Sequence, residues 1–382
     1  MSLARDVYVI GVGMHRFGKH DVSRRDMHYV AGMSALDDAG LSFRDVGALY
    51  SGYIGGNMLD GVTFAKDLGL TGLPVVHVEN ASATGSSAFR EAVMAVGGGS
   101  TDVALAIAFD GRLGNVAAAG GPRRPTMETN LLPAAFFAFW AVRRMHDNGT
   151  TVETFAKIAA KNWNHARLNK FAERQAEQEI TPEMVLAAPM VAYPHTAMMA
   201  CGAGAGAAAA IVATREVAER LSRGRPLVKV IASQMQSERY QPGHVFLGAI
   251  VGPSESTRIT ANLAYEEAGV GPEDLDLVHV HDAFPIEELM YYELLGICPD
   301  GEGDRLVAEG ATALGGRIPF STDGGLIGRG HPGGPTGLAQ IWDVTQQLRG
   351  ESGARQVEGA QIGLAHMMGA GSVCVVHILK RE

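Results

Sequence analysis

The stretch VVHVENASATGSSAFREAVMAVGGGSTDVALAIAFD, residues 75–110, decides the fold class of this chain. It opens with a short apolar run, passes through a loop of small residues, and continues as a helical pattern that ends at three consecutive glycines. A second apolar run, 103–109, follows and has the length of a buried strand. Strands that alternate with helices in this way indicate βαβ units, and hence an α/β fold with a parallel or mixed sheet.

The same order of elements recurs on both sides of this stretch. Near the N-terminus we predict a buried strand with a glycine turn over 7–18, and a helix from about Asp26 to Ala39 that stops at Gly40. The C-terminal half predicts, in order, a strand at 228–237, a helix near Thr257–Ala268, a strand at 276–284, a glycine-rich loop entering a helix at 321–350, and two strands around a glycine turn at 361–379. Residues 1–115 and 226–382 therefore look like two copies of one α/β unit.

Composition excludes several classes of protein. Hydrophobic residues make up 46% and charged residues 19% of the 382, which is typical of a globular chain with a large core and excludes wholesale disorder. The net charge of −9 argues against general nucleic-acid binding. The three cysteines, Cys201, Cys298 and Cys374, form neither a disulfide framework nor a CxxC zinc motif, so we expect a reducing cytoplasm. The longest apolar run, 197–213, is too short for a membrane span, and we expect neither a signal peptide nor a membrane segment.

A basic segment interrupts this acidic chain. Residues 111–175 hold ten Lys or Arg and four Asp or Glu, a local surplus of 10 − 4 = 6 positive charges. Such a surplus favours an anionic ligand such as a phosphate group, and the candidates are Arg123, Arg124, Arg143 and Arg144. The alternative is a solvated helical face.

Three loops carry the residues that could do chemistry. Ser82 precedes a predicted helix, where backbone N–H groups favour developing negative charge; it could be a nucleophile or part of an oxyanion site, or an ordinary helix cap. His281 follows an apolar strand, the place where α/β sheets hold ligands, and is either a proton donor or acceptor or a buried structural histidine. His331 lies among five glycines of the loop 328–337, which suits close ligand approach or a tight turn.

In their order and spacing, the segments VYVIGVGMHRFG, VENASATGSSAFREA, HDAFPIEELMYYELLG, GHPGGPTGLAQIWDVTQQLRG and GLAHMMGAGSVCVVHIL resemble the thiolase superfamily. The resemblance is to its sterol-carrier-protein-type and lipid-transfer-protein thiolase-like branch, and it covers nearly the whole chain. It implies a five-layered αβαβα fold from two pseudo-repeated halves, an N-terminal half 1–225 that includes a basic loop domain at about 111–200, and a C-terminal half 226–382. It also implies coenzyme A as a co-substrate, no bound cofactor and no metal.

The resemblance also shows departures. Ser82 stands where active members carry a nucleophilic cysteine, and Ala283 and Met367 stand at the two places where the second thiol can lie. The two histidines, His281 and His331, match those that line the pocket for the thioester oxygen. By the same correspondence we expect the pocket to include Asn80, Gly369 and Gly371.

Three functions stay open at this point. The first is a carbon–carbon lyase that cleaves a β-hydroxyacyl-CoA, possible without a covalent nucleophile; its base would be a histidine, Tyr291, Tyr292 or Asp323, and a small zinc-ribbon and oligonucleotide-fold protein would complete the site. The second is an acyltransferase that uses Ser82, activated by His331. The third is a non-catalytic acyl-CoA-binding subunit. The family further implies a dimer formed through the strand near residues 77–81.

Overall fold

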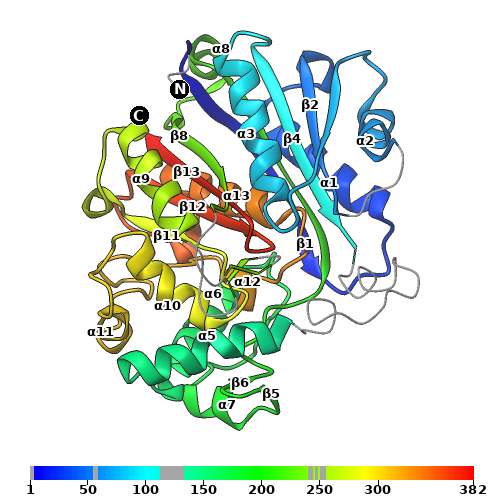
Figure 1. Cartoon of the computed structure of the whole chain (residues 1–382). Helices are drawn as coiled ribbons and strands as arrows, with labels where there is room; N and C mark the ends of the chain where they lie inside the picture. The colour runs from blue at the N-terminus through cyan, green and yellow to red at the C-terminus, as the bar shows by residue number, and fades with distance from the viewer. Residues whose placement is uncertain (1–3, 55–58, 112–132, 240–243, 246–247, 250–254) are drawn as a thin grey trace.

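The computed structural model describes residues 4–54, 59–111, 133–239, 244–245, 248–249 and 255–382. A nine-stranded mixed sheet runs through it in the order β11-β12-β13-β8-β1-β7-β4-β2-β3 (Figure 1). The N-terminal half contributes β1 (Val7–Gly18), β2 (Ala48–Gly52), β3 (Val75–Val78), β4 (Val103–Asp110) and β7 (Ala205–Thr214). The C-terminal half contributes β8 (Val228–Ser237), β11 (Leu277–His279), β12 (Ile362–Gly369) and β13 (Val373–Arg381).

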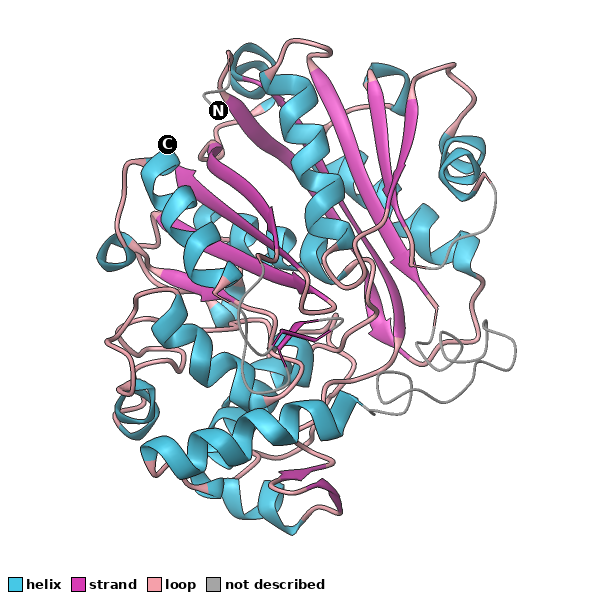
Figure 2. Cartoon of the chain, in the orientation of Figure 1, coloured by secondary structure: helices cyan, strands magenta, loops and turns pink. Residues whose placement is uncertain are grey.

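The two halves of the sheet meet where β1 pairs with β8, through Tyr8 with Lys229 and Val9 with Val228. Helices cover and separate them (Figure 2). On one side α1 (Arg24–Ala39) packs on β1 and β7, and on the other side α9 (Ser256–Ala268) packs on β8 and β13. Between the halves lie α3 (Thr84–Gly97), against β4 and β2, and α13 (Thr336–Arg349), against β12 and β7. This arrangement is the expected αβαβα layering.

Small residues bring the helices close to the sheet. The strand β7 reads AGAAAAIVAT, and although alanine favours strands poorly, its central residues are fully buried between helices. A Cβ atom at Gly11 of β1 would lie 2.3 Å from the Ala35 carbonyl oxygen of α1, so glycine is required there. The helix α1 begins two residues before its predicted start, at a capping box of Ser23 and Asp26, and ends at left-handed Gly40 as predicted.

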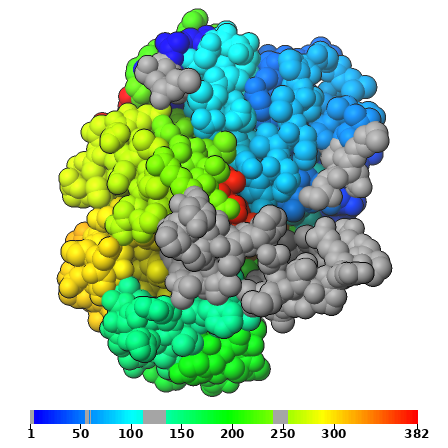
Figure 3. Space-filling model, in the orientation of Figure 1, coloured from blue at the N-terminus to red at the C-terminus, as the bar shows by residue number. Residues whose placement is uncertain are grey.

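The inserted segment packs on the C-terminal half. It comprises α5 (Pro133–Asn148), α6 (Val152–Arg167), α7 (Pro182–Ala187), β5 (Met190–Ala192) and β6 (His195–Thr196), and it forms the lower part of the face in Figure 3. Its apolar residues, among them Trp140 and Phe155, share one core with Phe284 and Tyr292 of the C-terminal half. The predicted division at 225/226 falls between α8 (Arg215–Leu221) and β8.

The remaining elements are short or peripheral: α2 (Asp60–Leu68), β9 (His244–Val245), β10 (Gly248–Ala249), α10 (Pro285–Leu294), α11 (Gly303–Ala308), α12 (Gly325–Gly328), and single 3-10 turns at Phe43–Asp45, Pro272–Asp274 and Gly353–Arg355. Of these, α10 and α12 matter most, because α10 follows the His281 loop and α12 leads into the loop of His331. Within the described residues, no helix has both the length and the apolar character needed to cross a membrane.

Candidate active site

Ser82 lies in a tight loop between β3 and α3. The backbone of the preceding residue, Ala81, is left-handed with a φ of +48°, and its N–H donates to Glu79 Oε1 over 2.7 Å. The Asn80 side chain donates to Ser87 Oγ over 2.9 Å, so it is turned toward α3 and shapes the loop. These contacts leave the Ser82 side chain half-buried at the start of α3.

His331 is the hydrogen-bond partner of Ser82. Its Nε2 lies 3.1 Å from Ser82 Oγ, and its Nδ1 lies 2.9 Å from Thr336 Oγ1. The Thr336 hydroxyl donates to the Pro332 carbonyl oxygen over 2.6 Å, so its oxygen is the acceptor for a proton on Nδ1. Nε2 then carries the lone pair, and the Ser82 hydroxyl donates to it.

The environment keeps His331 neutral. Burial lowers the pKa of His331 well below its ordinary value, and the nearby His281 and Arg329 lower it further. The residue that orients its ring is a neutral threonine, whereas a serine–histidine–aspartate triad has a carboxylate at that place. His331 is therefore unprotonated at neutral pH and is a weak base.

His281, on the loop that follows β11, lies beside His331. Its ring is perpendicular to that of His331, with 5.2 Å between the centroids. Its Nδ1 lies 3.0 Å from Glu287 Oε1, and its Nε2 is buried without a hydrogen-bond partner in the described part of the chain. Glu287 also accepts from the Ala283 N–H at 2.9 Å and from the Tyr291 hydroxyl at 3.1 Å. The carboxylate thus fixes the ring and supplies a counter-charge for a proton on it.

Close packing of α3 and α13 brings Ser82 and His331 together. A Cβ atom at Gly85 would lie 2.5 Å from the Gly334 carbonyl oxygen, and one at Gly337 would lie 2.1 Å from Ser86 Oγ. Only glycine allows the two helix starts to approach this closely. The two loops, 249 residues apart in sequence, meet for this reason.

The turn between β12 and β13 lies beside the Ser82 loop. A Cβ atom at Gly369 would lie 2.2 Å from the Asn80 carbonyl oxygen, and Ala370 and Gly371 both have left-handed backbones. Met367 of β12 is buried and packs with Ala83. The structure therefore brings Gly369 next to the loop of Asn80 and Ser82, and it puts an apolar side chain at one place where a second thiol could lie.

No cysteine lies ready to act as a thiolate in the described residues. Burial raises the pKa of Cys201, Cys298 and Cys374 to about 12 in each case. Cys201 adjoins the His281 loop through its backbone N–H, which donates to the Ala283 carbonyl oxygen over 2.9 Å.

The alternative bases of the sequence analysis have other partners. Tyr291 is buried on Glu287, one contact away from His281, and burial raises its pKa well above the ordinary value. The Tyr292 hydroxyl donates to Glu288, and its oxygen lies 3.2 Å from the Thr312 hydroxyl, which can donate to it. Asp323 pairs with Arg329. Among the hydrogen bonds of the described residues, none joins these three side chains to Ser82, His281 or His331.

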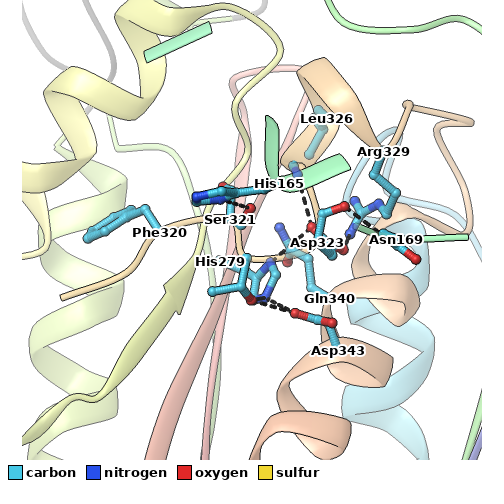
Figure 4. Close-up of polar contacts among 12 residues, drawn as sticks. His165, Asn169, His279, Phe320, Ser321, Asp323, Leu326, Arg329, Gln340 and Asp343 are labelled. Atoms are coloured by element: carbon cyan, nitrogen blue, oxygen red, sulfur yellow. Dashed lines mark hydrogen bonds and ion pairs between the residues drawn. The ribbon is translucent and has the colours of Figure 1, made fainter. Parts of the chain in front are cut away.

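His279, Asp323 and Asp343 form a buried cluster (Figure 4). Such a group could hold a cation, but each carboxylate already has an arginine: Arg329 pairs with Asp323 and Arg355 with Asp343. His279 Nε2 lies 3.0 Å from Asp343 Oδ2. The guanidinium groups supply the positive charge that a metal ion would bring, so we interpret the cluster as an internal ion network.

The basic residues predicted to bind phosphate separate into three groups. Arg123 and Arg124 lie outside the described residues. Arg143 is exposed and forms an ion pair with Asp147 on the same helix. Arg144 is buried, with Glu293 Oε1 at 2.7 Å and Asp304 Oδ2 at 3.0 Å, so its charge is balanced inside the protein.

Sequence reasoning missed two residues of the site, Thr336 and Glu287. Each lies in the first turn of the helix that follows its histidine, five residues after His331 and six after His281. A polar residue five or six positions after each histidine, in the first turn of the next helix, is the sequence signal that could have identified them.

The comparisons with known proteins agree with this fold. The thiolase C-terminal domain-like family matches residues 250–381. Sterol carrier protein 2 of Bos taurus is 33% identical over 396 residues, covering 99% of this chain and 73% of that protein. The benzoylsuccinyl-CoA thiolase subunit BbsB of Thauera aromatica is 36% identical over 380 residues, covering 97% and 96%.

Two solved structures share the fold over nearly their whole length. The Ltp2-ChsH2(DUF35) aldolase superposes with a TM-score of 0.83 at 23% identity, covering 100% of this chain and 99% of that one. Human mitochondrial 3-ketoacyl-CoA thiolase in complex with CoA gives 0.72 at 18%, covering 100% and 99%. The molecule is thus an α/β enzyme of the class that acts on acyl-CoA thioesters. The chain belongs to the thiolase superfamily, with relatives of the sterol carrier protein 2 type, and its chemistry is carbon–carbon bond chemistry on acyl-CoA.

Proposed function

We propose that this enzyme cleaves the Cα–Cβ bond of a β-hydroxyacyl-CoA in a retro-aldol reaction. The observation that carries the proposal is the pair of histidines, one whose Nε2 lone pair points at Ser82 and one backed by a carboxylate, around a serine with no cysteine thiol beside it among the described residues. An aldolase is among the structures with the same fold, which is consistent with this choice.

The reaction needs one base and one donor. His331 Nε2 takes the proton of the β-hydroxyl, whose oxygen becomes the carbonyl of the leaving aldehyde or ketone. The Cα–Cβ bond breaks, and its electron pair moves into the thioester to give an enolate. His281, whose ring Glu287 holds through Nδ1, donates from Nε2 to the enolate oxygen. The proton on His331 then passes to Cα, which is easy for so weak a base, and gives the shortened acyl-CoA.

An acyltransferase that uses Ser82 is the second candidate, and the 3.1 Å contact between Ser82 Oγ and His331 Nε2 favours it. Both reactions, however, require His331 to take a hydroxyl proton, from Ser82 or from the substrate, so its lowered pKa weakens it equally in each and does not decide between them. Ala283 and Met367 leave no second thiol to move the proton in the next step. We therefore place the lyase first.

Ser82→Ala separates the two reactions. The protein is incubated with panels of β-hydroxyacyl-CoA and β-ketoacyl-CoA, products are identified by mass spectrometry, and intact mass reports any acyl adduct. We expect Ser82→Ala to keep most of the cleavage activity, and Ser82→Cys not to create an efficient thiolase. Ser23→Ala, a helix cap on α1, is the matched control and should cost about 0.5–2 kcal/mol of stability without changing turnover.

Three results would change the assignment. An adduct on Ser82 that turns over at the steady-state rate would establish the acyltransferase. Binding of acyl-CoA without turnover on either panel would favour the non-catalytic subunit. Loss of all cleavage in Ser82→Ala, with normal folding, would refute the role given to His331.

We infer that coenzyme A is the co-substrate and that its phosphates contact the basic insert. CoA esters should raise the melting temperature by binding the folded state. Reversing the charges of Arg123 and Arg124 should reduce this shift more than reversing Arg215 and Arg220 on α8, outside the insert. Equal effects of the two pairs would contradict the phosphate site.

We further propose a homodimer through β3 and a small DUF35-type partner. Among the described strands, β3 is the last of its sheet and pairs with β2 alone, and Val76 on it is 45% exposed. The printed names of two relatives, a DUF35-containing aldolase and a thiolase subunit, motivate the partner. Light scattering of wild type and Val76→Lys tests the dimer, and co-expression with a DUF35 protein tests the complex by co-purification.

A further inference from the structure

Asp110 is a buried carboxylate at a junction of three segments that the mechanism above does not use. It is the last residue of β4 and is 4% exposed. Its Oδ2 accepts a hydrogen bond from the backbone N–H of Gly334, which lies between His331 and α13. A second backbone hydrogen bond comes from Ile54, two residues beyond the end of β2. One carboxylate thus connects the ends of two parallel strands to the histidine loop.

The contact leaves no room for side chains between the loop and the strand. A Cβ atom at Gly334 would lie 2.8 Å from Asp110 Oδ2 and 3.0 Å from the Phe109 carbonyl oxygen. One at Gly333 would lie 2.4 Å from Ile54 Cδ1. The loop is therefore pressed onto Asp110 and Ile54, and the carboxylate is the polar group that holds it there.

The position of this loop decides the position of the His331 ring. Pro332 and Thr336, on either side of Gly334, are joined by the hydrogen bond that directs the Thr336 oxygen at His331 Nδ1. A shift of Gly334 would move this pair and change the aim of Nε2 at Ser82 Oγ. Asp110 itself contacts neither Ser82 nor His331 among the hydrogen bonds of the described residues.

Two charged side chains face Asp110, from the elements packed around it. Arg24, at the start of α1, lies over the rings of Tyr53 and Phe109, and Glu79 follows β3. Burial raises the pKa of Asp110 to about 7, the two backbone hydrogen bonds and Arg24 lower it, and Glu79 raises it. Its negative charge is therefore present above neutral pH and is lost as the pH falls below it.

We propose that Asp110 is a positioning residue, whose ionised carboxylate holds the His331 loop in its working position through the backbone amides of Gly334 and Ile54. This rests on the proposed role of His331, but the loop contact can be measured without any activity. A charged acceptor makes a hydrogen bond roughly twice as strong as a neutral one, so protonation should loosen the loop without unfolding the protein.

Hydrogen–deuterium exchange tests the contact directly. Protection of the peptide containing Gly334 is compared at pH 8 and pH 6, corrected for intrinsic exchange rates, in wild type and Asp110→Asn. We expect protection in wild type to fall about tenfold between pH 8 and pH 6. In Asp110→Asn it should be low at both, because the neutral amide oxygen makes the weaker hydrogen bond at either pH.

Asp276→Asn is the matched control. Asp276 Oδ2 likewise accepts from two backbone amides, Gln361 at 2.7 Å and Ile362 at 2.9 Å, at the β11–β12 end of the sheet. This variant should leave the protection of the Gly334 peptide and its pH dependence as in wild type. If Asp110→Asn does not fold, the pH dependence of wild type alone decides, and a peptide whose protection is the same at both values overturns the proposal.

Kinetics then distinguish positioning from a merely structural role. In Asp110→Asn we expect kcat to fall about tenfold with KM within twofold, and the step near pH 7 in the kcat profile to disappear. An unchanged profile, or the same change in Asp276→Asn, overturns the proposal. If the protein has no lyase activity but the exchange result holds, the proposed function fails and the loop contact stands.

Discussion

Thr336→Val tests whether a single hydroxyl sets the state of His331. The substitution keeps the shape of the side chain and removes its oxygen. Thr336 is fully buried, and its hydroxyl makes two contacts, 2.6 Å to the Pro332 carbonyl oxygen and 2.9 Å to His331 Nδ1. Without it, Nδ1 has no hydrogen-bond partner that keeps the lone pair on Nε2.

These contacts give the expected size of two effects, the loss of stability and the loss of turnover. Each buried polar group left without a partner costs about 1–3 kcal/mol, so two of them should lower the free energy of unfolding by about 2–6 kcal/mol. The imidazole remains present, so turnover should fall by about 10–100-fold, less than the roughly 10²–10³-fold expected when a catalytic hydrogen-bond donor is removed. KM should change little, because Thr336 is buried behind the ring.

The assay is steady-state cleavage of a β-hydroxyacyl-CoA with products counted by mass spectrometry, alongside urea unfolding. Thr336→Ser restores the hydroxyl and should recover turnover to within about threefold. Thr345→Val on the same helix is the control, because the Thr345 hydroxyl is buried with no partner among the described residues; it should not reduce turnover. Equal turnover of Thr336→Val and wild type, in a folded protein, would refute the assignment of the His331 proton.

Three further predictions concern the histidines and the insert. Changing His281 or His331 to Ala should each cut turnover by roughly 10²–10³ with little change in melting temperature, and a large stability loss with normal activity would mean core histidines. Arg144→Met should cost about 3–5 kcal/mol in urea unfolding, because Glu293 and Asp304 lose their counter-ion, whereas exposed Arg143→Met should stay within about 0.5 kcal/mol; similar losses would contradict the buried ion pair. Burial lowers the pKa of His195 to about 4, so its contribution to stability is complete above its unfolded value near 6.5 and is lost as the pH falls from there toward 4. His195→Phe should therefore reduce the acid dependence of unfolding between pH 7 and 5 by up to about 1.4 kcal/mol per pH unit, and an unchanged slope would contradict it.

Local patterns in the sequence were enough to predict the main helices and strands and the three loops of the site. The helix that stops at Gly40, the strands 228–237 and 361–379, and the glycine-rich entry to α13 all form where predicted. These features depend on neighbours a few residues apart, such as a left-handed glycine or an apolar repeat, and are therefore visible in one dimension. His281, His331 and Ser82 could be selected as candidate site residues for the same reason, because each lies at the end of a predicted strand or just before a predicted helix.

Only the tertiary structure determines which of these residues lie together, which partners they pair with and which of them carry a proton. Arg144 looked like a phosphate ligand, yet it pairs with Glu293, 149 residues away, in a buried ion pair that no local pattern predicts. His331 is neutral with its lone pair toward Ser82, because α3 and α13 pack glycine to backbone and burial removes water from the ring. Protonation and pairing depend on distances and on burial, and these are set only when segments far apart in the sequence have packed together.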